Sequence, residues 1–329
     1  MIKKCVIITT INNPNEVIRF FENDKNFDLI VIGDNKTPDN SYKDLNGIYL
    51  SIKDQEKLYP SISRLIGYNH YARKKLGYIY AINNNYDIIY ETDDDNFPID
   101  LNFNHERVIL DNYKTFNAYK FYTDKHIWPR GYPLDKINTN HDEKFKFSEF
   151  KEESKIAATQ GLVNINPDVD AIFRLTSKID LSDFKFNRNL NNNLVLPKKT
   201  FGPGNTQNTY WRKKSVFYSL YLPSKVSFRY TDILKLYIAQ RIFWEHDLYF
   251  EYCPPNVNQY RNQHNLFQDL NSEFSMYLTT NNLIKTLSEI KIHESENPLI
   301  AIYNSLIEVG IIPNDEFKII KEWLRLIKF

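Results

Sequence analysis

The stretch DIIYETDDD, residues 87–95, decides the expected fold and points to a functional site. Residues 87–92 are rich in β-branched and aromatic side chains, which is typical of a buried strand. The run leads directly into three acidic residues, Asp93, Asp94 and Asp95. Ligands of open α/β sheets bind beyond the carboxyl ends of the strands, so we expect the acidic triplet to face a ligand.

Upstream of this stretch, strand-like and helix-like segments alternate, which indicates a parallel sheet with crossover helices. We expect strands at residues 4–9, 27–32 and 47–51, and a helix that begins at Asn13-Pro14 and runs through Phe21. After Tyr59-Pro60-Ser61 we expect one long helix. Its apolar stripe is formed by residues three or four positions apart, namely Leu65, Tyr68, Ala72, Leu76 and Ile79.

The rest of the chain is less regular. Residues 116–122 favour a strand, residues 123–158 a charged, loop-rich insertion, and residues 200–209 a polar loop. Residues 232–244 favour a strongly apolar helix, and residues 281–329 favour two or three amphipathic helices. The expected fold class is therefore α/β, with a mostly parallel central sheet flanked by helices and a C-terminal helical appendage over residues 276–329.

Composition and charge exclude several classes of function. The 329 residues carry a formal charge of +1, from 42 Lys and Arg against 41 Asp and Glu, so no overall field attracts nucleic acid or an anionic bilayer. No apolar run approaches the length of about 18 residues that spans a membrane, and the first run is too short for a signal peptide. Two cysteines cannot form a disulfide framework, so we expect a soluble protein in a reducing compartment, the cytoplasm.

The acidic triplet predicts a metal site. Side chains alternate along an extended chain, so Asp93 and Asp95 are expected on one side and Asp94 on the other. Two carboxylates on one side suit Mg²⁺ or Mn²⁺, which keep open positions for phosphate oxygens and would neutralise a departing diphosphate. The alternative is a turn through Asn96-Phe97-Pro98, although adjacent carboxylates repel one another by about 1 kcal/mol or more without a cation.

Several motifs, in the same order along the chain, resemble a known family. They are YETDDDN (90–96), WPRGYPL (128–134), QGL (160–162), NPDVDAIFRL (166–175), LPK (196–198), NTQNT (205–209), RYTDI (229–233) and AQR (239–241). Over roughly residues 5–270 they resemble the STELLO-type glycosyltransferase-like proteins. The triplet with residues 130–133 and 229–232 more distantly resembles the reversibly glycosylated polypeptides, which are plant UDP-arabinopyranose mutases.

Both resemblances imply a GT-A nucleotide-sugar fold over residues 1–275, with a nucleotide-binding part at about 1–122 and a donor-sugar and acceptor part at about 123–275. By their positions in the motifs, Asp93 and Asp95 are implied to bind the metal and the diphosphate. Arg130 matches the arginine that carries the sugar in the mutases. Uridine is implied as the base by family analogy. Two departures are expected: a chain without the N-terminal membrane anchor of the plant proteins, and residues 254–259 where the resemblance implies a metal-ligating histidine. Asn258 and His264 are the candidates for the third ligand.

Polar residues near the first strands and before the triplet are candidates for nucleotide binding. Thr9, Thr10 and Asn12 are expected to cradle the base. Asp34 could accept hydrogen bonds from uracil or ribose, although Gly33-Asp34-Asn35 also suits a plain turn. Arg64 and Lys74 could pair with phosphate oxygens or belong to a solvated helix face. Asp94 completes this nucleotide-binding group.

A second group of residues is expected to handle the sugar and the acceptor. Arg130 could bind phosphate bidentately or be an ordinary surface arginine, and the flanking Trp128 and Tyr132 could stack on a sugar or desolvate the guanidinium. Asp232 begins the apolar helix, either as an ordinary helix-start residue or as the general base or acceptor-orienting carboxylate. The candidates for contacts with sugar hydroxyls and donor are Gln160, Asp168, Asp170, Asn205, Gln207 and Asn208, which also suit plain turns.

Three functions are compatible with these features. The leading one is a metal-dependent glycosyltransferase that moves a sugar from a nucleoside diphosphate, with UDP favoured, to an acceptor hydroxyl in polysaccharide or glycoconjugate synthesis. Its partners would be a nucleotide sugar and a carbohydrate or glycolipid acceptor, with peripheral membrane association possible. The alternatives are a nucleotide-sugar mutase, which interconverts ring forms of the sugar, and a non-catalytic scaffold on the same fold.

Overall fold

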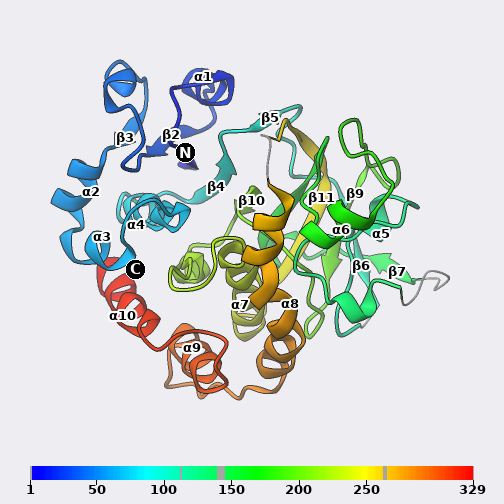
Figure 1. Ribbon diagram of the computed structural model, residues 1–329. Coiled ribbons are helices and arrows are strands. Elements are labelled where there is room, and N and C mark those ends of the chain that lie inside the picture. Colours follow the sequence, from blue (N-terminus) through cyan, green and yellow to red (C-terminus); the bar gives the residue numbers. More distant parts are fainter. Residues whose placement is uncertain (1, 112, 139–144, 262–264, 329) are drawn as a thin grey trace.

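The computed structural model describes residues 2–111, 113–138, 145–261 and 265–328. One continuous mixed sheet runs through these residues, and helices cover it (Figure 1). Four parallel strands form its first edge, in the order β3 (Ile48–Leu50), β2 (Asp28–Ile32), β1 (Lys4–Thr9) and β4 (Ile88–Asp93). All four of these strands lie where the sequence predicts them, within one or two residues.

The second part of the sheet mixes parallel and antiparallel pairs. From β4 outward it contains β10 (Asn208–Trp211), β8 (Ile156–Asn164), β11 (Tyr249–Gln259), β9 (Asn192–Leu196), β6 (Glu106–Leu110) and β7 (Phe147–Glu149). The short strand β5 (Asn96–Pro98) pairs with the end of β11. The expected α/β architecture, a large sheet flanked by helices, is confirmed. The parallel part is concentrated at the N-terminal edge, where crossover helices connect the strands.

Strand β1 shows why the sheet needs helices on both faces. Cys5 and Ile7 pack into the main core with residues of α4 (Lys74–Asn83), whereas Val6 and Ile8 pack into a second core with α1 (Glu16–Asn23). Successive side chains of a strand point to opposite faces, so a continuous apolar run must be covered twice.

Two predictions of secondary structure, one of a helix and one of a strand, are wrong. The long helix expected after Tyr59 is divided into α3 (Pro60–Ile66) and α4 because Gly67 adopts a positive φ of 79°, a backbone conformation that favours glycine and ends the helix. The strand expected at residues 116–122 is replaced by the one-turn helix α5 (Tyr119–Tyr122). Its aromatic side chains are buried without strand pairing, so their type alone misled the prediction.

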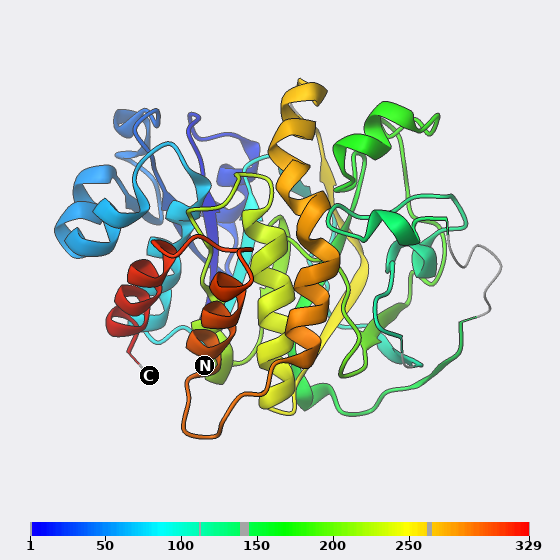
Figure 2. The ribbon, with the colours of Figure 1, turned by 60° about the horizontal axis from the view of Figure 1, so that its bottom comes forward.

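The remaining helices lie over the middle of the sheet. α7 (Thr231–Glu245), α8 (Leu266–Glu289), α9 (Pro298–Glu308) and α10 (Glu316–Leu326) form one continuous layer (Figure 2). The shorter helices α2 (Ile52–Leu58) and α6 (Ala171–Thr176) complete the set of described α-helices. Within the described residues, none of the helices combines the length and the apolarity needed to cross a membrane.

The C-terminal helices are built into the main core. Trp323 of α10 is fully buried, and its indole Nε1 donates a hydrogen bond of 2.9 Å to the Tyr218 carbonyl. Glu316 is also fully buried and accepts hydrogen bonds from the backbone N–H groups of Ser224 and Lys225. The boundary expected at residue 276 falls inside α8. Residues 221–230, which lead into α7, are thus held by the last helix of the chain.

Candidate active site

A cavity of about 260 Å³ lies at the carboxyl ends of β1 and β4, where the sequence places the acidic triplet. Its walls come from the ends of these strands, the loop before β10, the start of α7 and the segment after β11. The lining residues are Thr9, Tyr71, Asp93, Asp94, Asp95, Arg130, Asp168, Thr206, Gln207, Phe228, Arg229, Asp232, Gln259 and Arg261. One cavity therefore combines the expected metal residues with Arg130 and Asp232.

All three carboxylates of the triplet line this cavity, which corrects the expected alternation of Asp94 away from its neighbours. The reason is local: β4 ends at Asp93, and Asp94 and Asp95 lie in the turn that connects β4 to β5. The strand rule for alternating side chains applies only to extended backbone. The turn brings more negative charge to one wall than the sequence pattern indicates.

Each carboxylate of the triplet has a partner of its own. Lys74, fully buried on α4, donates from Nζ to Asp93 Oδ1 at 2.9 Å and to the Thr92 carbonyl at 2.9 Å. Asp94 accepts hydrogen bonds from the side chains of Thr10 and Asn12. Asp95 accepts one from Gln259 Nε2 at 2.9 Å. Lys74 is thus an internal countercharge for Asp93 and does not belong to a solvated helix face.

The electrostatics of the triplet favour a cation. Burial and the neighbouring charge of Asp93 raise the pKa of Asp95 to about 7, and burial also raises the pKa of Asp93 although Lys74 opposes the shift. Within the part of the chain that the structure describes, no three His, Cys, Asp or Glu side chains form a preformed metal cage. Mg²⁺ and Mn²⁺ are commonly held by one or two carboxylates together with substrate phosphates. Asp93 and Asp95 fit that kind of site.

A second cavity of about 220 Å³ adjoins the first one and shares Thr9, Tyr71, Asp94 and Phe228 with it. The nucleotide-binding candidates Thr9, Thr10, Asn12 and Asp34 all line this second cavity. Asp34 accepts backbone hydrogen bonds from Asn69 at 2.9 Å and His70 at 3.0 Å, so one of its roles is to hold the loop that forms the opposite wall. Arg64, in contrast, is exposed on α3 and lines neither cavity.

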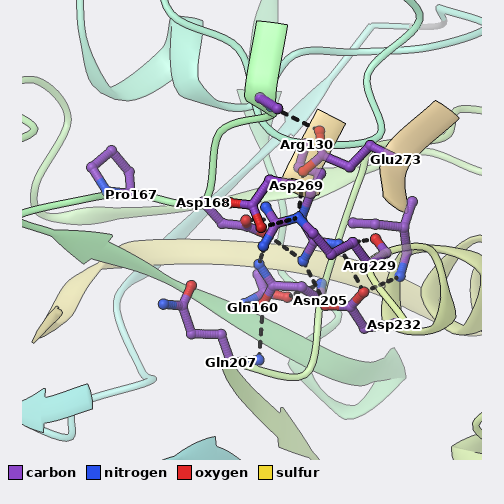
Figure 3. Close-up of polar contacts among 12 residues, drawn as sticks. Arg130, Gln160, Pro167, Asp168, Asn205, Gln207, Arg229, Asp232, Asp269 and Glu273 are labelled. Carbon is purple, nitrogen blue, oxygen red and sulfur yellow. Dashed lines mark hydrogen bonds and ion pairs between the residues drawn. The ribbon is translucent and has the colours of Figure 1, made fainter. Parts of the chain in front are cut away.

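Arg130 connects two acidic residues that lie far apart in the sequence (Figure 3). It is 6% exposed, and its Nε and Nη2 donate to the two oxygens of Asp168 at 2.9 Å each. Its Nη1 and Nη2 donate to the two oxygens of Asp232 at 2.9 and 2.7 Å. The remaining Nη1 hydrogen bond goes to the Arg229 carbonyl. All five N–H donors of the guanidinium are therefore used inside the protein.

The two carboxylates and the arginine stabilise one another's charged forms. Burial opposes ionisation of Asp168, but the charge and hydrogen bonds of Arg130 outweigh it and lower its pKa to about 2. Burial alone would lower the pKa of Arg130. The charges and hydrogen bonds of the two carboxylates outweigh the effect of burial, so the pKa of Arg130 is raised well above its usual value. We refer to Arg130, Asp168 and Asp232 as the arginine clamp.

The neighbours of Arg130 fix its position and do not form a sugar platform. Trp128 is buried and donates from Nε1 to Asp170, and Tyr132 is buried as well, so neither is available for the stacking expected from the sequence. Gly131 has a positive φ of 88°, and a Cβ at this position would collide with Ile233 of α7. Glycine is thus required where the loop carrying Arg130 approaches α7.

The candidates for sugar binding are divided by the structure. Gln207 lines the cavity, and its Oε1 is buried without a hydrogen-bond partner among the described residues. Gln160 and Asn205 hydrogen-bond to each other, and Asn205 Nδ2 also donates to Asp168 at 2.7 Å, so they support the clamp (Figure 3). Asn208, in β10, and Asp170, at the start of α6, are fully buried and line neither cavity.

Sequence reasoning missed several residues of the cavity wall. They are Tyr71, Thr206, Phe228, Arg229, Gln259 and Arg261. Arg229 and Arg261 form ion pairs with Glu273 and Asp269 of α8, which positions both guanidinium groups on the wall. Arg229 and Thr206 stand in the motifs at 229–233 and 205–209 and could have been found there, whereas Tyr71, Phe228 and Arg261 give no local signal. Of the candidates for a third metal ligand, Asn258 does not line the cavity, and His264 lies outside the described residues.

Comparison with known proteins finds similarity to one family of glycosyltransferases. A sequence model of the family described as STELLO glycosyltransferases matches residues 229–329. The chain is 29% identical over 279 residues to the Arabidopsis thaliana protein named probable glycosyltransferase STELLO1. It is 28% identical over 312 residues to the one named probable glycosyltransferase STELLO2.

The chain is thus similar to the STELLO glycosyltransferases. The aligned regions cover 78% and 87% of this chain but only 35% and 39% of the two Arabidopsis STELLO proteins. The resemblance expected from the motifs is therefore confirmed, and it extends to the C-terminal residues beyond position 270. The chain spans little more than a third of the length of these relatives, so what the complete relatives do enters only as a proposal.

Proposed function

We propose that this protein is a metal-dependent glycosyltransferase with a GT-A-like fold, which transfers a sugar from a nucleoside diphosphate, with UDP favoured, to an acceptor hydroxyl. One observation carries the proposal: the acidic triplet and the arginine clamp, which includes Asp232, line the same cavity. The adjoining cavity with Asp34 is suited to a nucleoside. The names of the relatives agree with the reaction class.

In this proposal Asp93 and Asp95 hold Mn²⁺ or Mg²⁺ together with the donor diphosphate. The ion would neutralise charge on the leaving diphosphate. Lys74 fixes Asp93 in position and opposes the rise in its pKa that burial causes. Arg229 and Arg261, which line the same cavity as the triplet, would add positive charge close to the leaving group.

Asp232 is the acceptor-orienting carboxylate and takes the acceptor proton late in the transfer. Arg130 holds both of its oxygens, and the backbone N–H of Ile233 donates to Oδ1 at 3.0 Å. A carboxylate held in this way is well oriented toward an acceptor hydroxyl. Arg130 therefore acts through Asp232 and Asp168, as a positioning residue.

The saturated guanidinium weighs against the mutase alternative. A sugar carried on Arg130 would require a nitrogen that is accessible and at least partly deprotonated, whereas all its N–H groups are engaged and its pKa is raised. Ring-form interconversion of a free nucleotide sugar would restore this alternative. The biological setting we propose is polysaccharide or glycoconjugate synthesis in the cytoplasm, with which the two buried free thiols, Cys5 and Cys253, agree.

The test is transfer or hydrolysis across a panel of nucleoside-diphosphate sugars with Mn²⁺, together with calorimetry of UDP binding with and without the metal. We expect Asp93→Asn/Asp95→Asn to lose metal-dependent UDP binding and turnover by at least about a hundredfold, since removing comparable electrostatic stabilisation costs about 3 kcal/mol or more. The matched control is Asp44→Asn/Asp183→Asn, which removes two exposed carboxylates outside the cavity. Full metal-dependent activity of the Asp93/Asp95 variant would overturn the assignment.

A further inference from the structure

The outward face of α8 carries a stripe of exposed apolar side chains. Phe267, Phe274 and Leu278 are 72%, 58% and 68% exposed. At about 100° per residue, these three positions fall within roughly 40° of one another around the helix. They lie opposite the buried face of α8, which includes Met276, Thr280 and Leu283. Large apolar residues scattered singly over a surface are ordinary, but an aligned set on one helix face marks a contact surface.

The charges of α8 are arranged so that this face is neutral. Between Leu266 and Ile284 the helix has two charged residues, Asp269 and Glu273, and both are buried. They are paired with Arg261 and Arg229 on the cavity wall. The outward face of this segment therefore carries no charge. The next charged residues are Lys285, which falls on the line of the stripe, and Glu289, about 40° from it; both are exposed, and their charges offset each other.

The stripe stands next to the mouth of the cavity. The hydroxyl groups of Ser275, on α8, and Ser227 lie 3.3 Å apart, and the adjoining Phe228 lines the cavity while half exposed. Figure 2 shows the N-terminal end of α8 reaching well beyond its neighbour α7 at the top of the molecule. A surface that accepts Phe267 would thus lie beside the cavity opening.

We propose that the outward face of α8 binds a phospholipid surface, with Phe267, Phe274 and Leu278 entering the region between headgroups and acyl chains. Aromatic and leucine side chains are suited to that region, and between Leu266 and Ile284 the outward face carries no acidic group that lipid phosphates would repel. A second copy of the chain fits less well. The three side chains together expose roughly 400 Å², at about 200 Å² for each large apolar side chain, whereas a stable dimer buries about 800 Å² per partner.

The test is flotation of the full chain with vesicles made of equal parts of phosphatidylcholine and phosphatidylglycerol. We expect the protein to float with the vesicles. In Phe267→Ser/Phe274→Ser/Leu278→Ser the lipid concentration for half-maximal binding should rise by at least about tenfold, because the apolar groups that enter the lipid are removed. The matched control, Phe20→Ser/Leu58→Ser/Val309→Ser, removes three apolar residues of 44–47% exposure on other elements and should bind like the unmodified chain.

A second variant tests the neutral face without removing apolar area. Asn271→Asp/Asn282→Asp places two acidic groups at exposed positions beside the stripe and should weaken binding to the same anionic vesicles. Absence of flotation of the unmodified chain would overturn the proposal, as would equal flotation of the stripe variant. The proposal would also be overturned if analytical sedimentation without lipid showed that the unmodified chain is a dimer and that the stripe variant, but not the control variant, is a monomer. These readouts need no glycosyl transfer, so they are independent of the proposed function.

Discussion

Replacing Arg130 by methionine is the most direct perturbation of the arginine clamp. The substitution removes five hydrogen bonds and leaves the carboxylates of Asp168 and Asp232, with side chains 12% and 9% exposed, facing each other without their countercharge. Removing one partner of a buried ion pair costs about 3–5 kcal/mol. The fall in the pKa of Asp168 from 3.8 to about 2 accounts for roughly 2 kcal/mol of this at neutral pH, at about 1.4 kcal/mol per pKa unit.

The free energy of unfolding is expected to depend on pH in a definite direction. Because the pKa of Asp168 is depressed in the folded state, its contribution is present above pH about 4 and is lost as the pH falls towards about 2. Urea unfolding followed by far-UV circular dichroism between pH 2 and pH 7 should therefore show this acid-sensitive slope in the unmodified chain and a flatter one in Arg130→Met.

Two further variants sharpen the measurement. Arg130→Lys keeps a charge but has three donors in place of five, so we expect a smaller loss of about 1–3 kcal/mol. Arg188→Met removes an arginine whose side chain is 55% exposed and should change the free energy of unfolding by less than about 0.5 kcal/mol. If Arg130→Met unfolded within about 1 kcal/mol of the unmodified chain with the same acid slope, the clamp would not be a stabilising element and the reasoning would be refuted.

Three other predictions concern the triplet, the C-terminal helices and the loop at Gly131. Burial and the charge of Asp93 raise the pKa of Asp95 to about 7, so without metal the free energy of unfolding should decrease as the pH rises from about 4 to about 7. In Asp95→Asn this decrease, roughly 2–4 kcal/mol in urea titrations, should be absent. Glu316→Ala leaves the N–H groups of Ser224 and Lys225 without their acceptor and should cost about 2–4 kcal/mol by thermal unfolding, while Glu152→Ala, whose side chain is 52% exposed in a surface ion pair with Lys155, should cost under about 1 kcal/mol. Gly131→Ala meets Ile233 at a positive φ and should lower stability by about 1–3 kcal/mol, together with any measured UDP affinity; an unchanged melting temperature would contradict the close approach.

The sequence by itself determined the N-terminal half of the sheet and the place of the acidic triplet. β1, β2, β3 and β4 are short apolar runs separated by helix-like segments, and such local periodicity is enough to assign both the strands and their parallel order. The same holds for α7, whose apolar residues recur at helical spacing. Because ligands of such sheets bind at the carboxyl ends of strands, the triplet could be placed at a cavity before any contact was known.

Only the tertiary structure decided what the polar residues of the site do. Asp168 and Asp232 stand 38 and 102 residues from Arg130, and no local pattern indicates that one guanidinium binds both. Likewise, the sequence left open whether Lys74 pairs with phosphate oxygens or lies on a solvated helix face, and only the packing of α4 on the sheet brings its ammonium group to Asp93. Periodicity records which face of an element is apolar, whereas the pairing of buried charges depends on which distant elements meet, and that is set by packing of the whole core.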